Sequence, residues 1–428
     1  MRVLTRDALV SSLRLLCVLC VSAVKYLQIP LPQRRRERRG GAEKNYKVRQ
    51  YSLTVRIAVL FFFLSALLPT ARTQQVSSQS LKDVFKSDFM IGAALNRRQF
   101  SEGDKRGLPI ITAQFNTITP ENQLKWQYVH PLPGKYDFVG SDGYVAFGEK
   151  YGMFVVGHTL VWHRQTPAWV FEDDKGKMVD RATLLSRLRD HIQTVVGRYK
   201  GKIRGWDVVN EALNADGSMR QSNWLKIIGD DYVAKAFEFA HEADPQAELY
   251  YNDYSLENEP KRNGAVKLIE KLKLQGIPIA GVGLQGHNRL DWPSMEQQDA
   301  TIKAFAKLGI KVNITELDID VLPHVSEEEG PSLKLNGELK TKLDPYPSGL
   351  PRSVSEEQAK RFAQLFAVYL KHRDVIDRVT FWGVTDADTW LNNWPVRGRT
   401  NHPLLFDREG QPKPAFDAVI AVGVTRQK

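Results

Sequence analysis

Two stretches decide the fold: Ile203-Arg-Gly-Trp-Asp-Val-Val-Asn-Glu211 and, further along the chain, Ile310-Lys-Val-Asn-Ile-Thr-Glu316. Each is a short run rich in apolar and β-branched residues, which is typical of a buried strand, and each ends in a glutamate. A closed parallel barrel places its chemistry at the carboxyl ends of its strands. Two carboxylates in such positions are the minimum equipment for cleaving a glycosidic bond.

The rest of the chain alternates strand-like runs with helical segments. Eight strands are expected, at residues 89–95, 114–119, 153–160, 203–210, 247–252, 277–285, 311–315 and 378–384. Apolar residues recur at helical spacing between them. Strand followed by helix, repeated eight times, predicts an α/β fold of the TIM-barrel class, a (β/α)8 barrel.

Two helical stripes and one loop illustrate this alternation. One stripe follows Asp180, an expected N-cap, ends before Gly201, and consists of Leu184, Leu188, Ile192, Val195 and Tyr199. A second opens with Ser355-x-x-Gln358, which has the form of a capping box, and consists of Phe362, Leu365, Phe366 and Tyr369. Residues 322–354, rich in Pro, Gly and charge, predict a long irregular loop after the seventh strand.

The net charge of +11 is confined to one end of the 428-residue chain. Residues 1–56 contain thirteen Lys and Arg against three acidic residues, which leaves the remainder close to neutral. A nearly neutral body argues against nucleic acid as a partner. The apolar and aromatic content supports a folded chain with a substantial core.

The first 73 residues read as a leader. Basic residues run up to Arg56 and meet the apolar run 57–68, followed by Pro69-Thr-Ala71, which is the order of a secretory signal. We therefore expect a basic extension at 1–56, a signal-like segment at 57–73 and a catalytic domain at 74–428. Two explanations of the extension stay open: a mis-annotated start, or an amino-terminal membrane anchor that includes the apolar stretch 9–29.

Both cysteines, Cys17 and Cys20, lie in this leader. A Cys-x-x-Cys pair would suit a redox or metal site, but no second pair accompanies it and its surroundings are apolar, so a passive role is expected. The predicted product is exported, either secreted or periplasmic, and contains no disulfide.

Polar and aromatic residues gather after six of the predicted strands. They lie in Asn116-Thr-Ile-Thr-Pro-Glu-Asn-Gln-Leu-Lys-Trp126, Gly157-His-Thr-Leu-Val-Trp-His-Arg-Gln165, Asn210-Glu211, Gln285-Gly-His287, Glu316-Leu-Asp318, and Trp382 with Trp390. Taken singly, each has an ordinary explanation as a solvated glutamate, a core tryptophan or a structural histidine. Polar and aromatic residues at six strand ends, all on one face of the barrel, indicate a functional site instead.

These motifs resemble those of family 10 glycoside hydrolases, the retaining endo-1,4-β-xylanases. The similarity covers residues 80–425 in the family's order, with Leu124 in place of a methionine in the motif that ends at Trp126. The resemblance implies that Glu211 is the acid/base and Glu316 the nucleophile of a double displacement. One carboxyl must then stay protonated, through burial or a negative neighbour, while the other stays ionised through hydrogen bonds. Their separation should be roughly 5 to 5.5 Å.

The same resemblance assigns further roles. Asn210 would bind the sugar 2-hydroxyl, and His287 would orient the nucleophile and keep it charged. The glycone subsites would be lined by Glu121, Asn122, Lys125, His158, Trp162, Gln165 and Gln285. Trp382 and Trp390 would stack on sugar rings and crowd the space that a hydroxymethyl group needs, and Tyr254 would stack on the aglycone side. Glu121 has an alternative role as a helix-start carboxylate.

The substrate expected from these features is xylan or xylo-oligosaccharides, with no cofactor, no metal and no protein partner, so we expect a monomer. Three alternatives stay open. His158 and His163 could belong to a metal-dependent barrel hydrolase, although the first strand offers no His-x-His pair. A β-1,4-glucanase would share the mechanism. A non-catalytic polysaccharide-binding barrel would need the aromatic platform without both carboxylates.

Overall fold

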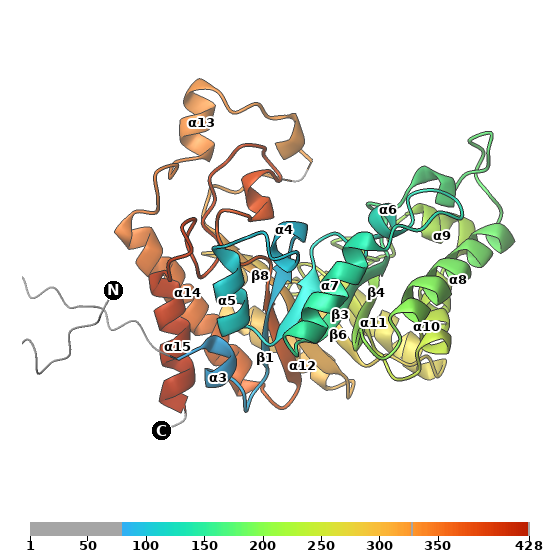
Figure 1. The fold of residues 1–428 in the computed structure, drawn as a ribbon, viewed down its shortest axis with the longest axis horizontal. Coiled ribbons are helices and arrows are strands. Elements are labelled where there is room, and N and C mark those ends of the chain that lie inside the picture. The colour runs from blue at the N-terminus through green and yellow to red at the C-terminus, as the bar shows by residue number, and fades with distance from the viewer. Residues whose placement is uncertain (1–78, 327, 427–428) are drawn as a thin grey trace, which may run out of the picture. The chain divides into compact units, whose positions relative to one another are not determined.

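Eight parallel strands close into a barrel in the computed structural model, which describes residues 79–326 and 328–426 (Figure 1). The first strand pairs with both the second and the last, and β6 pairs with β8, so these eight strands form a closed ring. The barrel strands are β1 Met90–Leu95, β2 Thr117–Pro120, β3 Phe154–Val161, β4 Gly205–Asn210, β5 Glu248–Asp253, β6 Gly281–Leu284, β8 Lys311–Asp320 and β9 Ile376–Phe381. The predicted (β/α)8 barrel is confirmed.

Each predicted strand corresponds to one strand of the barrel, because parallel strands covered on both faces are apolar along their length. All eight residues of β3 are buried. Several boundaries were wrong. Helix α5 Gly107–Gln114 ends at the start of the second run, β4 begins at Gly205 and β6 only at Gly281. Strand β9 begins at Ile376 and ends at Phe381, before the predicted 384, and β8 does not end at Glu316. Instead β8 continues to Asp320, because this extension pairs with a ninth short strand, β7 His287–Arg289.

Glycines let large side chains fill the barrel interior. A Cβ at Gly157 would lie 2.1 Å from the Trp206 ring, and one at Gly205 would lie 2.6 Å from Tyr250. Nothing larger than hydrogen fits at either position, so the two glycines in the motifs have a packing role. Arg378 is fully buried among these rings, with its guanidinium 4.6 Å from the centre of Tyr250.

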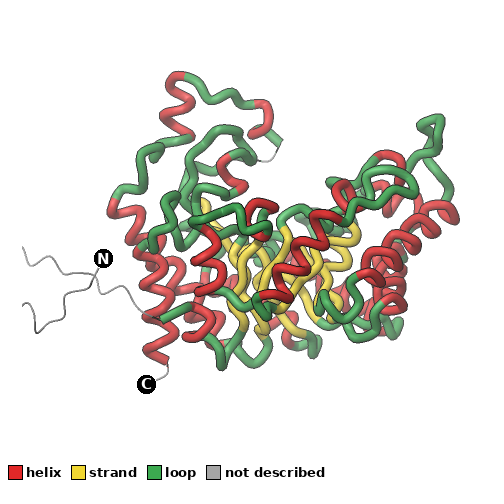
Figure 2. Tube along the Cα trace, in the orientation of Figure 1, coloured by secondary structure: helices red, strands yellow, loops and turns green. Residues whose placement is uncertain are grey.

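Helices form the outer layer around the barrel, as the red segments around the yellow strands in Figure 2 show. The longer ones are α7 Val139–Lys150, α8 Arg181–Arg198, α10 Tyr232–Ala243, α11 Glu259–Leu274, α12 Met295–Ala306, α14 Arg352–Lys371 and α15 Pro414–Arg426. Shorter ones are α3 Leu81–Val84, α4 Arg97–Phe100, α6 Trp126–Val129 and α9 Asn223–Ile228. The predicted cap of α8 is confirmed, since the Asp180 carboxylate accepts from the Thr183 amide at 2.8 Å.

The capping box predicted at Ser355 and Gln358 was wrong. Helix α14 already begins at Arg352, with Pro351 as its N-cap, so both residues lie inside the helix. The Gln358 amide instead donates to the His402 carbonyl at 2.7 Å.

The long loop predicted over 322–354 is less irregular than expected. It contains a short 3-10 turn at Gly330–Ser332 and the helix α13 Gly337–Leu343, and α14 begins before its predicted end. Helix α13 rises above the carboxyl ends of the strands in Figure 1. It was missed because its sequence has no continuous apolar stripe: Leu343 is its single buried residue.

The two ends of the described chain meet below the barrel. Gly423 of α15 lies so close to α3 that a Cβ there would come within 2.3 Å of Val84 Cγ1. Arg426, at the end of α15, also forms an ion pair with the buried Asp88. In Figure 1, α15 runs beside α14 on the outside of the barrel, and α3 lies next to its lower end.

The predictions for residues 1–78, including the leader, its apolar runs and the two cysteines, fall outside the described residues. Within residues 79–326 and 328–426, no helix combines the length and apolar character needed to cross a bilayer.

Candidate active site

Glu211 follows the last residue of β4 and carries three hydrogen bonds on its carboxyl group. Trp162 Nε1 donates to Oε2 at 2.8 Å, while Asn210 Nδ2 and Gln285 Nε2 donate to Oε1 at 3.2 and 3.1 Å. The Glu211 backbone has a φ of +58°, in the left-handed region that non-glycine residues rarely occupy. Residues in such conformations concentrate at functional sites, where surrounding contacts hold them.

Glu316 lies inside β8 and is buried. His287 Nε2 contacts its Oε2 at 3.2 Å, and Asn252 Nδ2 donates to its Oε1 at 2.9 Å. Burial alone would raise the pKa of Glu316, but the hydrogen bond from His287, the charges of His158 and His287 and the bond from Asn252 outweigh it and lower that pKa. The expectation of an ionised carboxylate at Glu316 therefore has a physical cause in its neighbours.

His287 sits between two carboxylates. Its Nδ1 lies 3.1 Å from Asp318 Oδ1, and the other oxygen of Asp318 accepts from Trp390 Nε1 at 2.8 Å. Burial disfavours the charged imidazole, but Asp318 and Glu316 prevail and raise the pKa of His287 to about 10. A chain of contacts thus runs from Glu316 through His287 and Asp318 to the indole of Trp390.

Three side-chain amides connect the two glutamates. Asn252 Nδ2 donates both to Glu316 and to Asn210 Oδ1 at 2.9 Å, and Asn210 donates in turn to Glu211. Gln285 Nε2 bridges Asn210 Oδ1 and Glu211 Oε1. Both carboxyl groups therefore belong to one network at the barrel mouth, while their separation of roughly 5 to 5.5 Å stays a prediction.

The loops after β2 and β3 form one wall of the site. Asn122 Oδ1 accepts from Lys125 Nζ at 3.2 Å and from Gln165 Nε2 at 3.4 Å. The ammonium of Lys125 lies 5.0 Å from the centre of the Trp162 ring. Burial lowers the pKa of Lys125, opposed by the charges of Glu316, Glu121 and Glu211. The structure thus brings these predicted subsite residues together near both glutamates.

A buried aromatic stack anchors this wall. Lys125 precedes α6, whose Trp126 stacks on His191 of α8 with ring centres 3.6 Å apart. His191 Nδ1 lies 3.3 Å from His130 Nδ1. Burial lowers the pKa of His130 to about 4 and holds that of His191 well below its usual value. The two rings are therefore neutral packing elements at ordinary pH.

His158 of β3 contacts a carboxylate and an indole. Its Nδ1 lies 2.9 Å from Asp207 Oδ2, and its ring meets that of Trp382 edge-on at 5.4 Å. Burial lowers the pKa of the neighbouring His163 to about 4. Among the described residues, 79–326 and 328–426, no three His, Cys, Asp or Glu side chains are grouped so that they could hold a metal ion.

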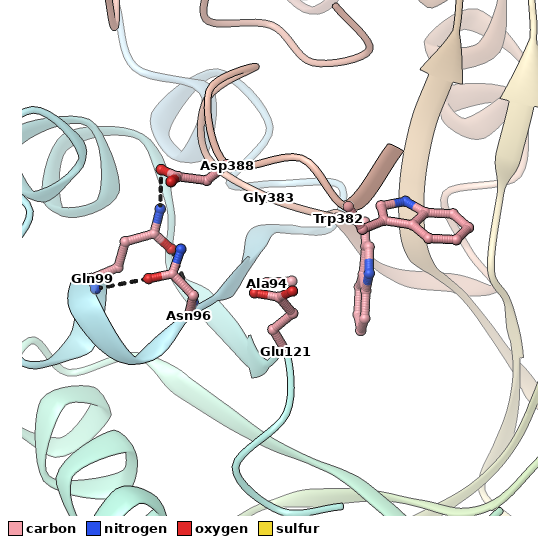
Figure 3. A pocket seen from close by; sticks show the side chains of 8 residues that line it. Ala94, Asn96, Gln99, Glu121, Trp382, Gly383 and Asp388 are labelled. Atoms are coloured by element: carbon pink, nitrogen blue, oxygen red, sulfur yellow. Dashed lines mark hydrogen bonds between the residues drawn. The ribbon is translucent and has the colours of Figure 1, made fainter. Parts of the chain in front are cut away.

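A small cavity lies between the ends of β1 and β2 and the loop after β9 (Figure 3). Glu121 points toward Ala94 and Trp382 in this view, and Gln99 donates to Asp388 at 3.5 Å on the opposite side. Burial raises the pKa of Glu121. The cavity is lined by Ala94, Asn96, Gln99, Glu121, Trp382, Gly383, Asp388 and Trp390. Because α6 begins only at Trp126, Glu121 is not a helix-start carboxylate.

The loop after β4 forms the wall beyond Glu211. Arg220 donates to the Glu211 and Leu213 carbonyls and to the Tyr254 hydroxyl, each at 3.1 Å. Lys261 Nζ lies 3.5 Å from the centre of the Tyr254 ring, so this ring has at most one face left for a sugar.

Four residues in the site received no role from the sequence: Asn252, Asp207, Asp318 and Arg220. Asn252 ends a strand-like run, as the assigned residues do, and this position was the available signal. Asp207 and Asp318 lie within recognised motifs, where a carboxylate two or three residues from a strand end could be expected to support a histidine. Arg220 carries no local signal, since its contacts depend on how the loop folds back.

The arrangement can perform acid/base chemistry together with nucleophilic attack. One carboxyl group, Glu211, accepts hydrogen bonds from two side-chain amides and one indole. The other, Glu316, is held as an anion beside a cationic imidazole. A pair of carboxyl groups between hydrogen-bonding and aromatic walls suits cleavage of a bond between two sugars.

Comparisons with known proteins agree with this geometry. The family model described as "Glycosyl hydrolase family 10" matches residues 80–422. The endo-1,4-beta-xylanase A of Xylanibacter ruminicola is 45% identical over 354 residues, which are 83% of this chain and 96% of that protein. A beta-1,4-xylanase of Dictyoglomus thermophilum is 42% identical over 374 residues, or 87% and 98% of the two chains.

Solved structures give the same result. An endoxylanase from a sugarcane soil metagenome superposes with a TM-score of 0.76 at 46% identity, covering 81% of this chain and 99% of its own. A mutant structure in complex with xylotriose superposes with a TM-score of 0.72 at 38% identity, covering 80% and 99%.

Proposed function

The chain belongs to glycosyl hydrolase family 10, and from this premise we propose that it is a retaining endo-1,4-β-xylanase that hydrolyses internal β-1,4-xylosidic bonds of xylan. Relatives named as xylanases, at 45% and 42% identity over most of the chain, support this substrate. The observation that carries the mechanism is the pair of carboxyl groups, Glu211 and Glu316, joined by one amide network.

The proposed reaction is a double displacement. Glu316 attacks the anomeric carbon while Glu211 donates a proton to the leaving oxygen, so that the glycosidic bond breaks as the bond to Glu316 forms. The resulting glycosyl-enzyme ester is then hydrolysed by water. Glu211 takes a proton from that water, and the Glu316 carboxylate leaves.

The neighbours of each carboxyl group suit these roles. The cationic His287 and the Asn252 amide favour the anionic form of Glu316 before attack. Asn210, hydrogen-bonded between Glu211 and Asn252, is the proposed partner of the sugar 2-hydroxyl. A contact of this kind strengthens as the ring gains oxocarbenium character, so it stabilises the transition state more than the ground state.

The walls of the cleft support a preference for xylose. We propose Asn122, Lys125, His158, Trp162, Gln165 and Gln285 as hydrogen-bonding residues of the glycone subsites. Trp382 and Trp390 line the cavity of Figure 3 together with Glu121 and leave little room there. A glucose residue carries an additional hydroxymethyl group, which would have to enter this crowded space.

Product analysis on xylan alongside a soluble cellulose derivative tests the substrate. The anomeric configuration of the first product, followed by NMR, tests the mechanism. We expect xylo-oligosaccharides released with retained β configuration. An inverted product would contradict double displacement, whereas faster cleavage of the glucan would contradict only the sugar and favour the β-1,4-glucanase alternative.

A pair of variants separates a hydrolase from a binding barrel. Glu316→Ala should abolish turnover and leave xylan binding in place, while Glu242→Ala, on the outer helix α10, should retain wild-type turnover. If the unmodified protein bound xylan and released no sugar, the alternative of a non-catalytic polysaccharide-binding barrel would be correct.

We also propose that the enzyme is exported and acts as a monomer. The segment from Arg34 to Ala71, with basic residues followed by a short apolar run, supports export. Mass spectrometry of the protein recovered from medium, periplasm and membranes would identify its location and its first residue. Light scattering after size exclusion would give its mass, and a dimer mass would contradict the monomer.

A further inference from the structure

The backbone at Glu211 needs external support. Its φ of +58° places it among four non-glycine residues with positive φ in the described parts of the chain. For residues other than glycine, this conformation is unfavourable because Cβ comes too close to the following carbonyl oxygen. The Glu211 amide is held by the Asn252 carbonyl at 2.9 Å, which fixes one side of the residue. Its carbonyl oxygen requires a partner on the other side.

Arg220 provides that partner. Its Nε donates to the Glu211 carbonyl at 3.1 Å, and one terminal nitrogen donates to the Leu213 carbonyl at the same distance. The Arg220 amide also donates to the Ala212 carbonyl at 2.7 Å, and an antiparallel bridge joins Leu213 to Met219. The loop thus folds back, so that one guanidinium spans three consecutive residues beginning at Glu211.

The guanidinium is itself fixed from the neighbouring strand. The nitrogen that contacts Leu213 also donates to the Tyr254 hydroxyl at 3.1 Å. Tyr254 follows β5, and its ring is packed against Lys261, which forms a buried ion pair of 2.7 Å with Asp253. The guanidinium is planar and rigid, so it loses little conformational freedom when several partners hold it. It can therefore fix the position of the Glu211 backbone closely, which proton transfer requires.

We propose that Arg220 is a positioning residue for the acid/base, holding the Glu211 backbone so that its carboxyl group meets the leaving oxygen. This inference rests on the proposed function. In the first step, Glu211 transfers its proton to the leaving oxygen as the C–O bond breaks and the bond to Glu316 forms. Without Arg220 the carboxyl group shifts, and proton transfer is impaired while attack by Glu316 is not.

Substrates with different leaving groups test this proposal. Dinitrophenolate is a stable anion and leaves without being protonated, whereas the sugar oxygen of a xylo-oligosaccharide must receive a proton as it leaves. For Arg220→Met, the rate of xylotetraose cleavage should fall roughly 10- to 100-fold, because a positioned general acid contributes about 10²-fold or more. The rate of the dinitrophenolate burst from 2,4-dinitrophenyl β-xylobioside should stay within roughly threefold of wild type. Arg220→Lys should recover part of the loss.

Hydrolysis of the glycosyl-enzyme, the second step, gives an independent test of the same proposal. A displaced Glu211 is also a poor base, so the glycosyl-enzyme of Arg220→Met should accumulate. Azide needs no base to attack the anomeric carbon and displace the Glu316 carboxylate. Azide should therefore accelerate the variant's turnover of the dinitrophenyl substrate and yield xylobiosyl azide, and it should not accelerate the wild-type enzyme.

The chain contains a matched control. Arg187 of α8 likewise donates to backbone carbonyls of a loop, at Val170 and Glu172, with 3.1 and 3.0 Å. Arg187→Met should stay within roughly twofold of wild type with both substrates, because no reacting carboxyl group depends on it. The amplitude of the dinitrophenolate burst gives the concentration of correctly folded active sites, so all rates are expressed per active site. If Arg220→Met fails to fold, the ratio of the losses with xylotetraose and with the dinitrophenyl substrate is measured for Arg220→Lys instead.

The outcomes are distinct. Equal losses with both substrates, no response to azide, or a profile like that of Arg187→Met would overturn the positioning role. Failure of the wild-type protein to cleave xylotetraose would overturn the proposed function itself, before any variant is compared.

Discussion

The side-chain amide of Asn252 donates a 2.9 Å hydrogen bond to Oε1 of Glu316. The same nitrogen reaches Asn210 Oδ1, and the amide is oriented by the Thr315 hydroxyl, which donates to Asn252 Oδ1 at 2.7 Å. Asn252 therefore presents N–H groups, and not its oxygen, to the nucleophile. The orientation of the nucleophile depends on a residue of a neighbouring strand.

Removing this donor should reduce catalysis without unfolding the barrel. For Asn252→Ala we expect kcat to fall roughly 10²-fold, the usual effect of deleting one preorganised hydrogen-bond donor in an active site. Thr315→Val keeps the Asn252 amide and removes only the hydroxyl that orients it, so kcat should fall less than in Asn252→Ala. Steady-state kinetics on xylotetraose would measure both. Equal losses for the two variants would contradict the assigned role.

A charge at the same position should change the pH profile. Asn252→Asp places a second carboxylate beside Glu316, and like charges disfavour each other's ionised form. The pKa of Glu316 should rise, and the acidic limb of kcat/KM should move to higher pH. An unchanged acidic limb would mean that this limb does not report Glu316.

His287 should control that limb as well. The pKa of Glu316 is lowered against the effect of burial, chiefly by the hydrogen bond from His287. In His287→Gln this cation is lost, so the pKa of Glu316 should rise and activity should disappear at a higher pH than in wild type. His241→Gln, at an exposed position on α10, is the control and should leave the pH profile unchanged.

The same imidazole has a consequence for stability. The pKa of His287 is raised to about 10 in the folded protein, compared with an ordinary value of 6.5. Its contribution to stability is therefore fully present below about pH 6.5 and is lost as the pH rises through about 10. Melting temperatures between pH 7 and 10 should fall more steeply for wild type than for His287→Gln. Parallel curves would contradict a charged His287.

The buried histidine pair predicts the opposite dependence. The pKa of His130 is lowered to about 4, so the unfolded chain binds a proton between about pH 6.5 and 4 that the folded protein does not. Stability should therefore fall as the pH decreases through this range. His130→Gln removes the titrating group, and its free energy of unfolding, measured with urea, should change less over the same range.

Removal of metal ions should leave activity unchanged. The proposed reaction uses proton transfer and carboxylate attack, and neither step needs a metal ion. Dialysis against EDTA, followed by assay on xylan, measures this. Inhibition that zinc or manganese reverses would show that two carboxyl groups are insufficient.

The barrel was predictable because its signals are local. Strands such as β3 are buried along their whole length, so they are visible as apolar runs, and the site residues lie where those runs end. The pairing of β7 with the end of β8 was not visible, since His287–Arg289 is short and polar and its pairing depends on a distant segment. The assigned residues were found through motifs.

Residues that act through other residues were harder to recognise. Asn252 and Arg220 acquire their roles from contacts with Glu316, Asn210 and the Glu211 backbone, which lie elsewhere in the sequence. A single asparagine or arginine outside a motif gives no sequence pattern from which such long-range contacts can be predicted. The capping box at Ser355 failed for a related reason: the pattern was present, but a proline upstream had already begun the helix.

The contact between α3 and α15 has a practical consequence. Because Gly423 packs against Val84 beneath the barrel, the chain enters and leaves the described unit at neighbouring points on the face opposite the glutamates. A resin, bead or fusion partner joined ahead of Ser80 would hold the enzyme by its base and leave the mouth facing insoluble fibre. The two ends are also close enough to be linked by a short peptide, so new termini could be opened in a surface loop.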